Sequence, residues 1–210
     1  MKKQTIKIHR KTKETDITLD LRLYGKGSAR TDTGIPFLDH MLALFCKFSF
    51  VDINLKSAGD LSVDIHHTNE DIGIALGLAI SDALKNRRSI KRFGSAIVPM
   101  DESLTGVRVA VDISGRSGFY WTTPRGVKNI SIPQGAIQTA KGAKYLLQDV
   151  KHFFKSFAGS SLITMHIDVL KSEDPHHTIE SIFKACGKAF AEAVAIEKRA
   201  DFPSTKGRII

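Results

Sequence analysis

The chain has 210 residues, of which 42% are hydrophobic and 25% charged, and its formal net charge is +9. This length suits one large domain or two small ones, and the composition is that of a soluble globular protein. No apolar run approaches the length of a membrane span, and residues 1–13 are basic without the apolar stretch of a signal peptide, so a cytoplasmic protein with no membrane partner is expected.

The excess of positive charge has three interpretations. A solvated basic surface is the commonest, and binding of an anionic substrate comes next. Nucleic acid comes last, and no nucleic-acid partner is expected, because the basic residues are scattered and no aromatic RNA-binding segment occurs. The two cysteines, Cys46 and Cys186, lie in apolar helix-like segments and are expected to be small buried hydrophobes.

The first half of the chain alternates strands and helices. Residues 19–25 alternate apolar and polar side chains and end at a glycine, which predicts a strand and a turn. A helix is expected over residues 37–45 and a strand over 51–56. A second helix is expected from His66 to about Lys85.

The second half repeats this order. A strand is expected over residues 109–115, a helix over 146–154, a strand over 162–170 and a helix from 176 to about 195. The stretch Tyr120 to Gly142 is longer than its counterpart and carries glycine, proline and serine, which favours a surface loop or an extra hairpin.

A unit of strands and helices that occurs twice predicts an internally duplicated α+β fold. Each half is expected to be a mixed sheet with two helices on one face. The boundary is expected near residues 86–90, which divides one compact globular unit into residues 1–88 and residues 89–210.

The most informative repeat is a histidine motif. The string HHTNE at 66–70 returns 110 residues later as HHTIE at 176–180. His40 and His152 occupy matching helices, 112 residues apart. A lone histidine is more often an ordinary core or surface residue than a ligand. Six histidines in register with two glutamates, however, predict metal binding, because imidazole and carboxylate suit first-row divalent ions.

Helix geometry restricts how these ligands combine. Residues three or four apart share a face, so Glu70 lies on the same side as His66 and His67, whereas neighbouring residues diverge by about 100°. One histidine of each pair is therefore expected to share a site with its own glutamate and the other to join a second site. His40 and His152 would complete two pseudo-equivalent sites, each with roughly three imidazoles and one carboxylate. The partition of the ligands, and whether a site lies within or between subunits, stays open at this point.

The donor set also restricts the metal. The absence of thiolate ligands excludes a structural cysteine-type zinc site, and the all-oxygen shells of Ca²⁺ or Mg²⁺ do not match. Mn²⁺, Fe²⁺, Zn²⁺ and Co²⁺ remain.

Further strings follow in a fixed order, namely ET at 14–15, TGIPFLDHM at 33–41, RFGSA at 92–96, VPMDE at 98–102, SGR at 114–116, HFF at 152–154 and PSTKG at 203–207. Together with the two histidine motifs they are spread over nearly the whole chain, from residue 14 to residue 207. In these strings the chain resembles the imidazoleglycerol-phosphate dehydratase family.

The resemblance implies a hydro-lyase of histidine biosynthesis that converts D-erythro-imidazole glycerol phosphate to imidazole acetol phosphate, through an imidazolate bound to two metal ions. It implies two Mn²⁺ ions per active site, a homo-oligomer of 24 subunits with metals at subunit contacts, and halves that resemble the second domain of ribosomal protein S5. The implied ligands are His40, His66, His67, Glu70, His152, His176, His177 and Glu180.

The resemblance also implies substrate-binding residues. Contacts to the phosphate are implied for Arg92, Arg116, Ser204 and Lys206, because arginine and lysine bind phosphate well. Glu14 is implied as a catalytic carboxylate that contacts the substrate and moves a proton at its side chain. Glu180 is a second catalytic candidate, either as a ligand or as a base near the ring.

Two other classes of protein stay open at this stage. A two-metal hydrolase would use the ions to activate water, and a metal-binding assembly protein would turn over nothing. Glu14 and the basic set of Arg92, Arg116 and Lys206 favour the enzyme, because a storage protein does not need them. A nucleotide site at residues 204–207 is rejected, because no glycine stands at the spacing of a P-loop.

Overall fold

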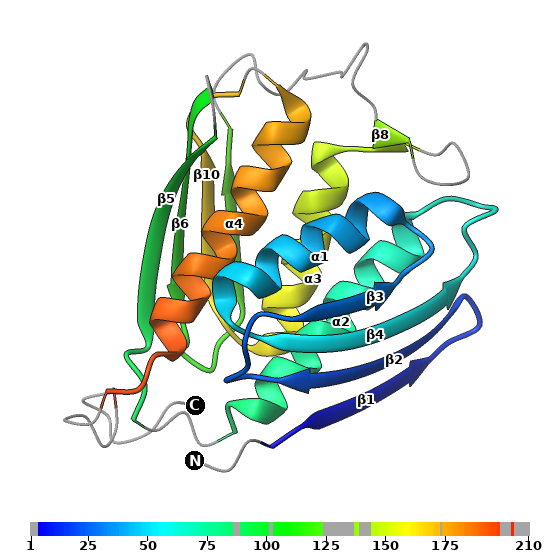
Figure 1. The fold of residues 1–210 in the computed structure, drawn as a ribbon, viewed down its shortest axis with the longest axis horizontal. Helices are drawn as coiled ribbons and strands as arrows, with labels where there is room; N and C mark the ends of the chain where they lie inside the picture. Colours follow the sequence, from blue (N-terminus) through cyan, green and yellow to red (C-terminus); the bar gives the residue numbers. More distant parts are fainter. Residues whose placement is uncertain are drawn as a thin grey trace.

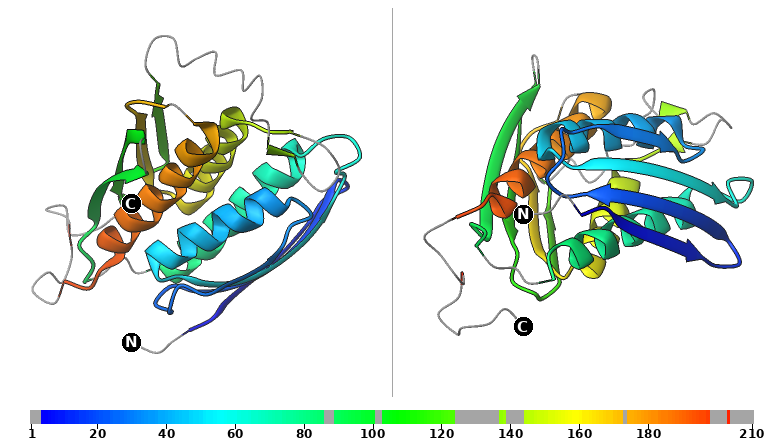
Figure 2. Two further views of the ribbon diagram at one scale, coloured as in Figure 1. Left: turned by 45° about the horizontal axis from the view of Figure 1, so that its top comes forward. Right: turned by 60° about the horizontal axis from the view of Figure 1, so that its bottom comes forward.

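Two four-stranded sheets form the outer layers of the protein, and four helices lie between them (Figure 1). Figure 2 shows α1 and α2 beside the first sheet and α3 and α4 beside the second. The computed structural model describes residues 4–85, 89–100, 103–123, 137–138, 144–172, 174–197 and 203.

The first half is a mixed sheet with two helices on one face. Its strands lie in the order β1-β2-β4-β3, with β1, β2 and β4 antiparallel and β3 parallel to β4. The elements are β1 Ile6–Lys11, β2 Thr15–Arg22, β3 Ala29–Asp32, α1 Pro36–Ser49, β4 Asp52–Gly59 and α2 His66–Ala83.

The second half has the same plan. Its strands lie in the order β5-β6-β10-β7, with β7 parallel to β10 and the other neighbours antiparallel. The elements are β5 Phe93–Met100, β6 Ser103–Asp112, β7 Gly118–Thr122, α3 Leu147–Ser161, β10 Thr164–Val169 and α4 Pro175–Val194, with an extra pair β8 Ile137–Gln138 and β9 Lys144–Tyr145. The prediction of a duplicated α+β fold is confirmed.

Most boundaries differ from the expected ones by a few residues. The predicted strand over 19–25 begins earlier, because the alternation already starts at Thr15, and the strand expected over 109–115 ends at Asp112. The sequence predicts a surface loop or an extra hairpin for the stretch from Tyr120 to Gly142. Tyr120 to Thr122 belong to β7, and Ile137–Gln138 form β8, which pairs antiparallel with β9; residues 124–136 and 139–143 lie outside the described residues. The boundary near residues 86–90 stays a prediction, and residues 86–88 also lie outside the described part.

Two glycines set how the halves pack against each other. A Cβ atom at Gly77 of α2 would lie 2.6 Å from the carbonyl oxygen of Phe157 in α3. At the pseudo-equivalent Gly187 of α4, it would lie 2.7 Å from that of Phe45 in α1. Only glycine permits such close backbone contact. Each helix therefore packs on a helix of the other half, which brings histidines of both halves together.

The two cysteines are free and buried, as expected. Burial raises the pKa of the Cys46 thiol to about 12, and the pKa of Cys186 is raised well above its ordinary value for the same reason. In the described part of the chain, no helix is both long and apolar enough to span a membrane.

Candidate metal centres and substrate site

The first cluster joins helices of both halves. Glu180 of α4 accepts hydrogen bonds at Oε1 from Nε2 of His40 in α1 and from Nε2 of His176 in α4, at 3.0 Å each. Asp174 caps α4 by accepting from the backbone N–H of His177 at 2.8 Å, so the first turn presents His176 and Glu180 on one face. The three ligand atoms all lie within 4.8 Å of one another, which is close enough to hold one ion.

Glu180 is the most buried member of this cluster. Its side chain is 9% exposed, against 50% for His40 and 46% for His176. Burial by itself raises the pKa of Glu180, but hydrogen bonds from Lys184, His40 and His176 outweigh it and lower the pKa to about 2. Lys184 Nζ donates to Oε2 at 2.7 Å. The sequence analysis missed this lysine, although its i, i+4 spacing from Glu180 was a usable signal.

A consequence for stability follows from the depressed pKa of Glu180. The folded pKa of about 2 lies below the ordinary 4.5, so the charged side chain stabilises the fold above about pH 4.5, and this contribution is lost as the pH falls towards 2. Urea unfolding of metal-free protein should show a larger loss of unfolding free energy between about pH 6 and about pH 3 in the wild type than in Glu180→Gln. Equal losses would contradict this role of Glu180.

The second cluster is the pseudo-symmetric partner of the first. Oε1 of Glu70 in α2 lies 3.6 Å from Nε2 of His66 and 3.7 Å from Nδ1 of His152 in α3. The ligand atoms again lie within 4.8 Å of one another. Glu70 is 35% exposed, and α2 carries Ile74 at the position that matches Lys184. The two clusters thus share ligand types but differ in the surroundings of the carboxylate.

A buried bridge connects the two clusters. The ring of Phe37 lies 5.3 Å from that of His176 and 5.3 Å from that of Tyr145. Tyr145, which is fully buried, donates from its hydroxyl to Oδ1 of Asn69 at 2.7 Å. Asn69 lies between His66 and Glu70 in the motif and donates from Nδ2 to the carbonyl oxygen of Asp149 in α3 at 2.9 Å. The bridge therefore holds α2 and α3, and with them the ligands of the second cluster, next to the first.

The second histidine of each motif lies outside these two clusters. The ring centroids of His66 and His67 are 6.0 Å apart, as are those of His176 and His177, so neighbouring rings point in different directions. Within the described part of a single chain, each cluster has two imidazoles and one carboxylate. His67 instead forms a third group with Glu14 and Asp60.

This third group combines a metal-ligand candidate with a catalytic candidate. Nδ1 of His67 lies 2.9 Å from Oδ2 of Asp60 and 3.7 Å from Oε2 of Glu14. The hydrogen bond to Asp60 raises the pKa of His67 most, and the charge on Glu14 also raises it, against an opposing effect of burial. The sequence analysis missed Asp60, because its proximity to His67 depends on where β4 ends.

Glu14 occupies a tight turn between β1 and β2. The hydroxyl of Thr12 accepts hydrogen bonds from the backbone N–H groups of Glu14, at 3.1 Å, and Thr15, at 3.0 Å. The Thr15 hydroxyl and Arg10 Nη1 both donate to Oδ2 of Asp71 in α2, at 2.5 Å each. The backbone at Glu14 is thereby fixed to α2, while its carboxylate stays 53% exposed and open to a substrate.

Arg92, one of the expected phosphate contacts, lies at a different end of the protein from the two histidine clusters. The Arg92 guanidinium donates to both carboxylate oxygens of Asp112, at 2.7 and 3.1 Å, and to the carbonyl oxygen of Pro203 at 2.9 Å. Arg116 is exposed in the loop after β6. Ser204 and Lys206 lie outside the described residues, but they follow Pro203 directly in the sequence.

The distance between the two ends is large. The backbone N–H of Arg92 donates to the carbonyl oxygen of Ala193 at 2.9 Å, in the last turn of α4, whereas His176 lies in the first turn of the same helix. At a rise of 1.5 Å per residue, α4 separates these two positions by about 26 Å. A small molecule bound at the first cluster therefore does not reach Arg92 of the same chain.

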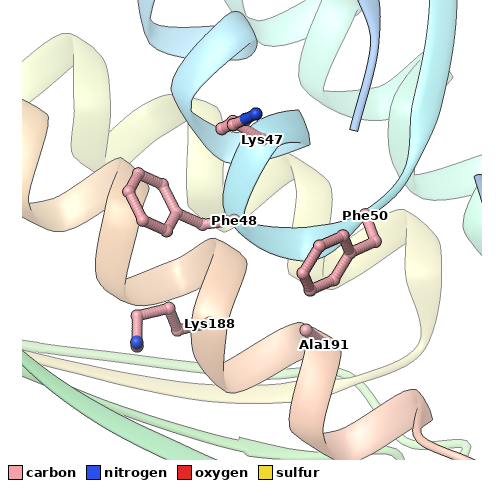
Figure 3. Close-up of a pocket in the computed structure, with 5 residues that line it drawn as sticks. All are labelled: Lys47, Phe48, Phe50, Lys188 and Ala191. Carbon is pink, nitrogen blue, oxygen red and sulfur yellow. The ribbon is translucent and has the colours of Figure 1, made fainter. Parts of the chain in front are cut away.

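A cavity of about 440 Å³ lies beside the C-terminal end of α1 (Figure 3). It is lined by Lys47, Phe48, Phe50, Lys188 and Ala191, from the C-terminal end of α1 and from α4. His40 lies at the other end of α1. Because these lining residues include neither a histidine nor a carboxylate, the cavity offers no metal ligands of the expected kind.

Comparisons with known proteins agree on one family. The family model described as imidazoleglycerol-phosphate dehydratase matches residues 33–190. A protein of that name from Methanocella arvoryzae is 48% identical over 200 residues, which cover 95% of this chain and 96% of the relative. One from Thermoanaerobacter sp. is 46% identical over 208 residues, which cover 99% of both chains.

Solved structures give the same result. The crystal structure of imidazoleglycerol-phosphate dehydratase from Staphylococcus aureus superposes with a TM-score of 0.75 at 28% identity, covering 92% of this chain and 99% of the other. The structure of IGPD from Pyrococcus furiosus, in complex with (S)-C348, has a TM-score of 0.74 at 34% identity and covers 95% and 99% of the two chains.

Proposed function

This chain belongs to the imidazoleglycerol-phosphate dehydratase family, and we propose that it dehydrates D-erythro-imidazole glycerol phosphate to imidazole acetol phosphate with two Mn²⁺ ions per active site. Family membership makes it a dehydratase of histidine biosynthesis that acts on a small phosphate-bearing substrate. We place the reaction in the cytoplasm. Membership of a dehydratase family argues against a two-metal hydrolase and against a metal-storage protein.

The observation that supports metal dependence best is the pair of pseudo-symmetric clusters. Each offers two imidazole nitrogens and one carboxylate oxygen within 4.8 Å of one another. This donor set fits Mn²⁺, and three protein ligands leave positions open for the substrate and for further ligands. The histidines at 40, 66, 152 and 176 and the glutamates at 70 and 180 would hold the metal. A bound metal would supply a Lewis acid that stabilises the substrate ring in its deprotonated form.

The residues of the chain would then handle protons and position the substrate. Glu14 is partly exposed on a fixed turn and lies next to His67, so its carboxylate can transfer a proton at the substrate side chain. Glu180 stays ionised near neutral pH, because its pKa is about 2. It is therefore available as a ligand, while its hydrogen bond from Lys184 makes it a poor base.

The separation of the phosphate residues from the clusters supports a homo-oligomer. Since about 26 Å of helix separates His176 from the Arg92 end, we infer that the metal ligands of one copy and Arg92, Arg116, Ser204 and Lys206 of another copy share a substrate. His67 and His177 are not members of the clusters of their own chain and would complete clusters of neighbouring copies. The exposure of His40 and His176 leaves room for such contacts. An assembly of 24 subunits is the form that we propose.

The decisive experiment is turnover of imidazole glycerol phosphate by metal-stripped protein, with and without added Mn²⁺. Formation of the ketone product is followed directly. Turnover is expected only after Mn²⁺ is restored, and the melting temperature should rise with it, because the metal binds the folded state. Full activity of protein with no detectable metal would overturn the metal-dependent mechanism, and no turnover in metal-loaded assembled protein would overturn the proposed substrate.

A further inference from the structure

We propose that Asp60 is a positioning residue for His67. The Asp60 carboxylate accepts a hydrogen bond from Nδ1 of His67, which leaves Nε2 of that imidazole directed towards the metal. The proposal rests on the role proposed above for His67 as a metal ligand. Asp60 is neither a metal ligand nor a substrate contact in the proposed function, so the proposal adds a new residue to the site.

The geometry of the pair determines which ring nitrogen is available. Oδ2 of Asp60 lies 2.9 Å from Nδ1 of His67, which is an ordinary hydrogen-bond distance. An ionised carboxylate can only accept, so Nδ1 carries the proton and donates. In the neutral imidazole the lone pair is then on Nε2, which is the atom left to bind a metal. Metal-bound histidines commonly donate their other N–H to a carboxylate, which orients the ring and raises its basicity.

The position of Asp60 is itself fixed by the fold. It directly follows Gly59, the last residue of β4, where an added Cβ would lie 2.0 Å from the hydroxyl oxygen of Thr68 in the first turn of α2. Glycine at 59 thus allows β4 to approach α2 next to His67. The backbone N–H of Asp60 donates to the carbonyl oxygen of Glu14 at 3.1 Å, and its carbonyl oxygen accepts from Val63 at 2.8 Å.

These contacts connect the catalytic candidate to the metal ligand. The Asp60 main chain holds the main chain at Glu14, and the Asp60 side chain holds the ring of His67. A shift of Asp60 would therefore change the distance between the Glu14 carboxylate and the metal. A misplacement of this kind reduces turnover even when all the reacting groups are present.

The Asp60 carboxylate makes its side-chain hydrogen bond through one oxygen only. Oδ1 is buried and has no hydrogen-bond partner among the residues that the structure describes. A buried acceptor without a partner lowers stability. The side-chain hydrogen bond that the structure shows for Asp60 is the contact of its other oxygen with His67.

The position that corresponds to Asp60 in the second half does not carry an acid. Position 170, which lies 110 residues after Asp60, is a leucine that is 47% exposed. A leucine cannot accept a hydrogen bond from an imidazole through its side chain. The proposal therefore predicts that loss of Asp60 weakens the metal held through His67 and leaves the metal held through His177 unchanged.

The test compares Mn²⁺ binding and turnover in Asp60→Asn and Asp60→Glu. Asp60→Asn is expected to lower the Mn²⁺ affinity of one of the two sites by about 10- to 100-fold, and to lower kcat. The affinity of the other site and the melting temperature of the metal-free protein should not change. Asp60→Glu should restore part of the affinity, because a carboxylate returns near Nδ1. Binding is measured by titration of assembled, metal-stripped protein with Mn²⁺, followed by electron paramagnetic resonance.

Asp64→Asn is the matched control. Asp64 also lies near enough to raise the pKa of His67 through its charge, but it hydrogen-bonds the backbone N–H of His66 at 2.7 Å and not the His67 ring. Asparagine can still accept that hydrogen bond through its side-chain oxygen. The control therefore removes one nearby charge and leaves the Asp60 carboxylate at Nδ1 of His67, and it should bind both ions as the wild type does.

Three results would overturn the proposal. Unchanged affinity in Asp60→Asn would leave Asp60 without a role in binding, and equal weakening in Asp64→Asn would make the effect one of charge alone. Complete loss of one ion from Asp60→Asn, with no partial recovery in Asp60→Glu, would make Asp60 a direct ligand. If the wild type itself binds no Mn²⁺, the proposed function fails first, so the two failures are distinguishable.

Discussion

Glu14→Gln is expected to lower kcat for imidazole glycerol phosphate by about 10²- to 10⁴-fold, the usual contribution of a positioned acid or base. Glutamine has the shape of glutamate but cannot exchange a proton at neutral pH. The backbone at residue 14 is held by Thr12 and Asp60, so the change should not disturb the turn. Metal content and melting temperature should therefore match those of the wild type.

The matched control for this prediction is Asp20→Asn. Asp20 lies on β2, which follows the same turn, and its carboxylate is 42% exposed and 3.8 Å from Lys7. This variant also removes one exposed negative charge, and its kcat should equal that of the wild type. Wild-type kcat in Glu14→Gln would remove Glu14 from the mechanism, whereas loss of metal from the same variant would show that the carboxylate acts as a ligand.

Two inactive variants are expected to regain turnover when they assemble together. His40→Ala removes a candidate ligand of the first cluster, and Arg116→Ala removes a cation at the other end of the protein. If the substrate lies between copies, some sites in a mixed assembly combine an intact cluster from one copy with an intact Arg116 from another. When the two variants are mixed at random in equal amounts, about a quarter of the sites in a symmetric assembly should have this composition.

The measurement is turnover after the two variants are unfolded, mixed and refolded with Mn²⁺, compared with each variant treated alone. His40 and Arg116 are both exposed, so the substitutions should not prevent folding. Recovery of activity in the mixture alone supports a site shared between copies. A mixture as inactive as its parents, despite verified co-assembly, would place all site residues within one chain and contradict the inferred oligomer.

Helical and strand periodicity accounts for most of what could be predicted about the fold. The repeat of histidine motifs indicated the duplication, and hydrophobic alternation indicated strands such as β2, because side-chain direction along a strand or helix is a local property. Strand ends were less well predicted. The first residue of β2, for example, depends on the pairing of β2 with β4, in which Thr15 lies opposite Gly59.

Some features of the candidate site could likewise be predicted from the sequence, and others depend on the tertiary structure. The ligand types, their number and the divergence of adjacent histidines follow from the sequence by itself, because residue identity and helix geometry are sufficient to derive them. The resemblance to a family supplied the phosphate residues and Glu14. It did not supply Asp60, Lys184 or the Tyr145 bridge, whose roles depend on contacts between distant segments.

The tertiary structure decided which ligands meet. His40 could have met either glutamate, and its contact with Glu180 exists because α1 packs on α4 across the two halves, through close contact at Gly187. The same packing at Gly77 brings His152 to Glu70. Helix packing across the halves joins residues more than 80 positions apart. Such non-local contacts are selected by the shape of the whole core, and no local pattern encodes them.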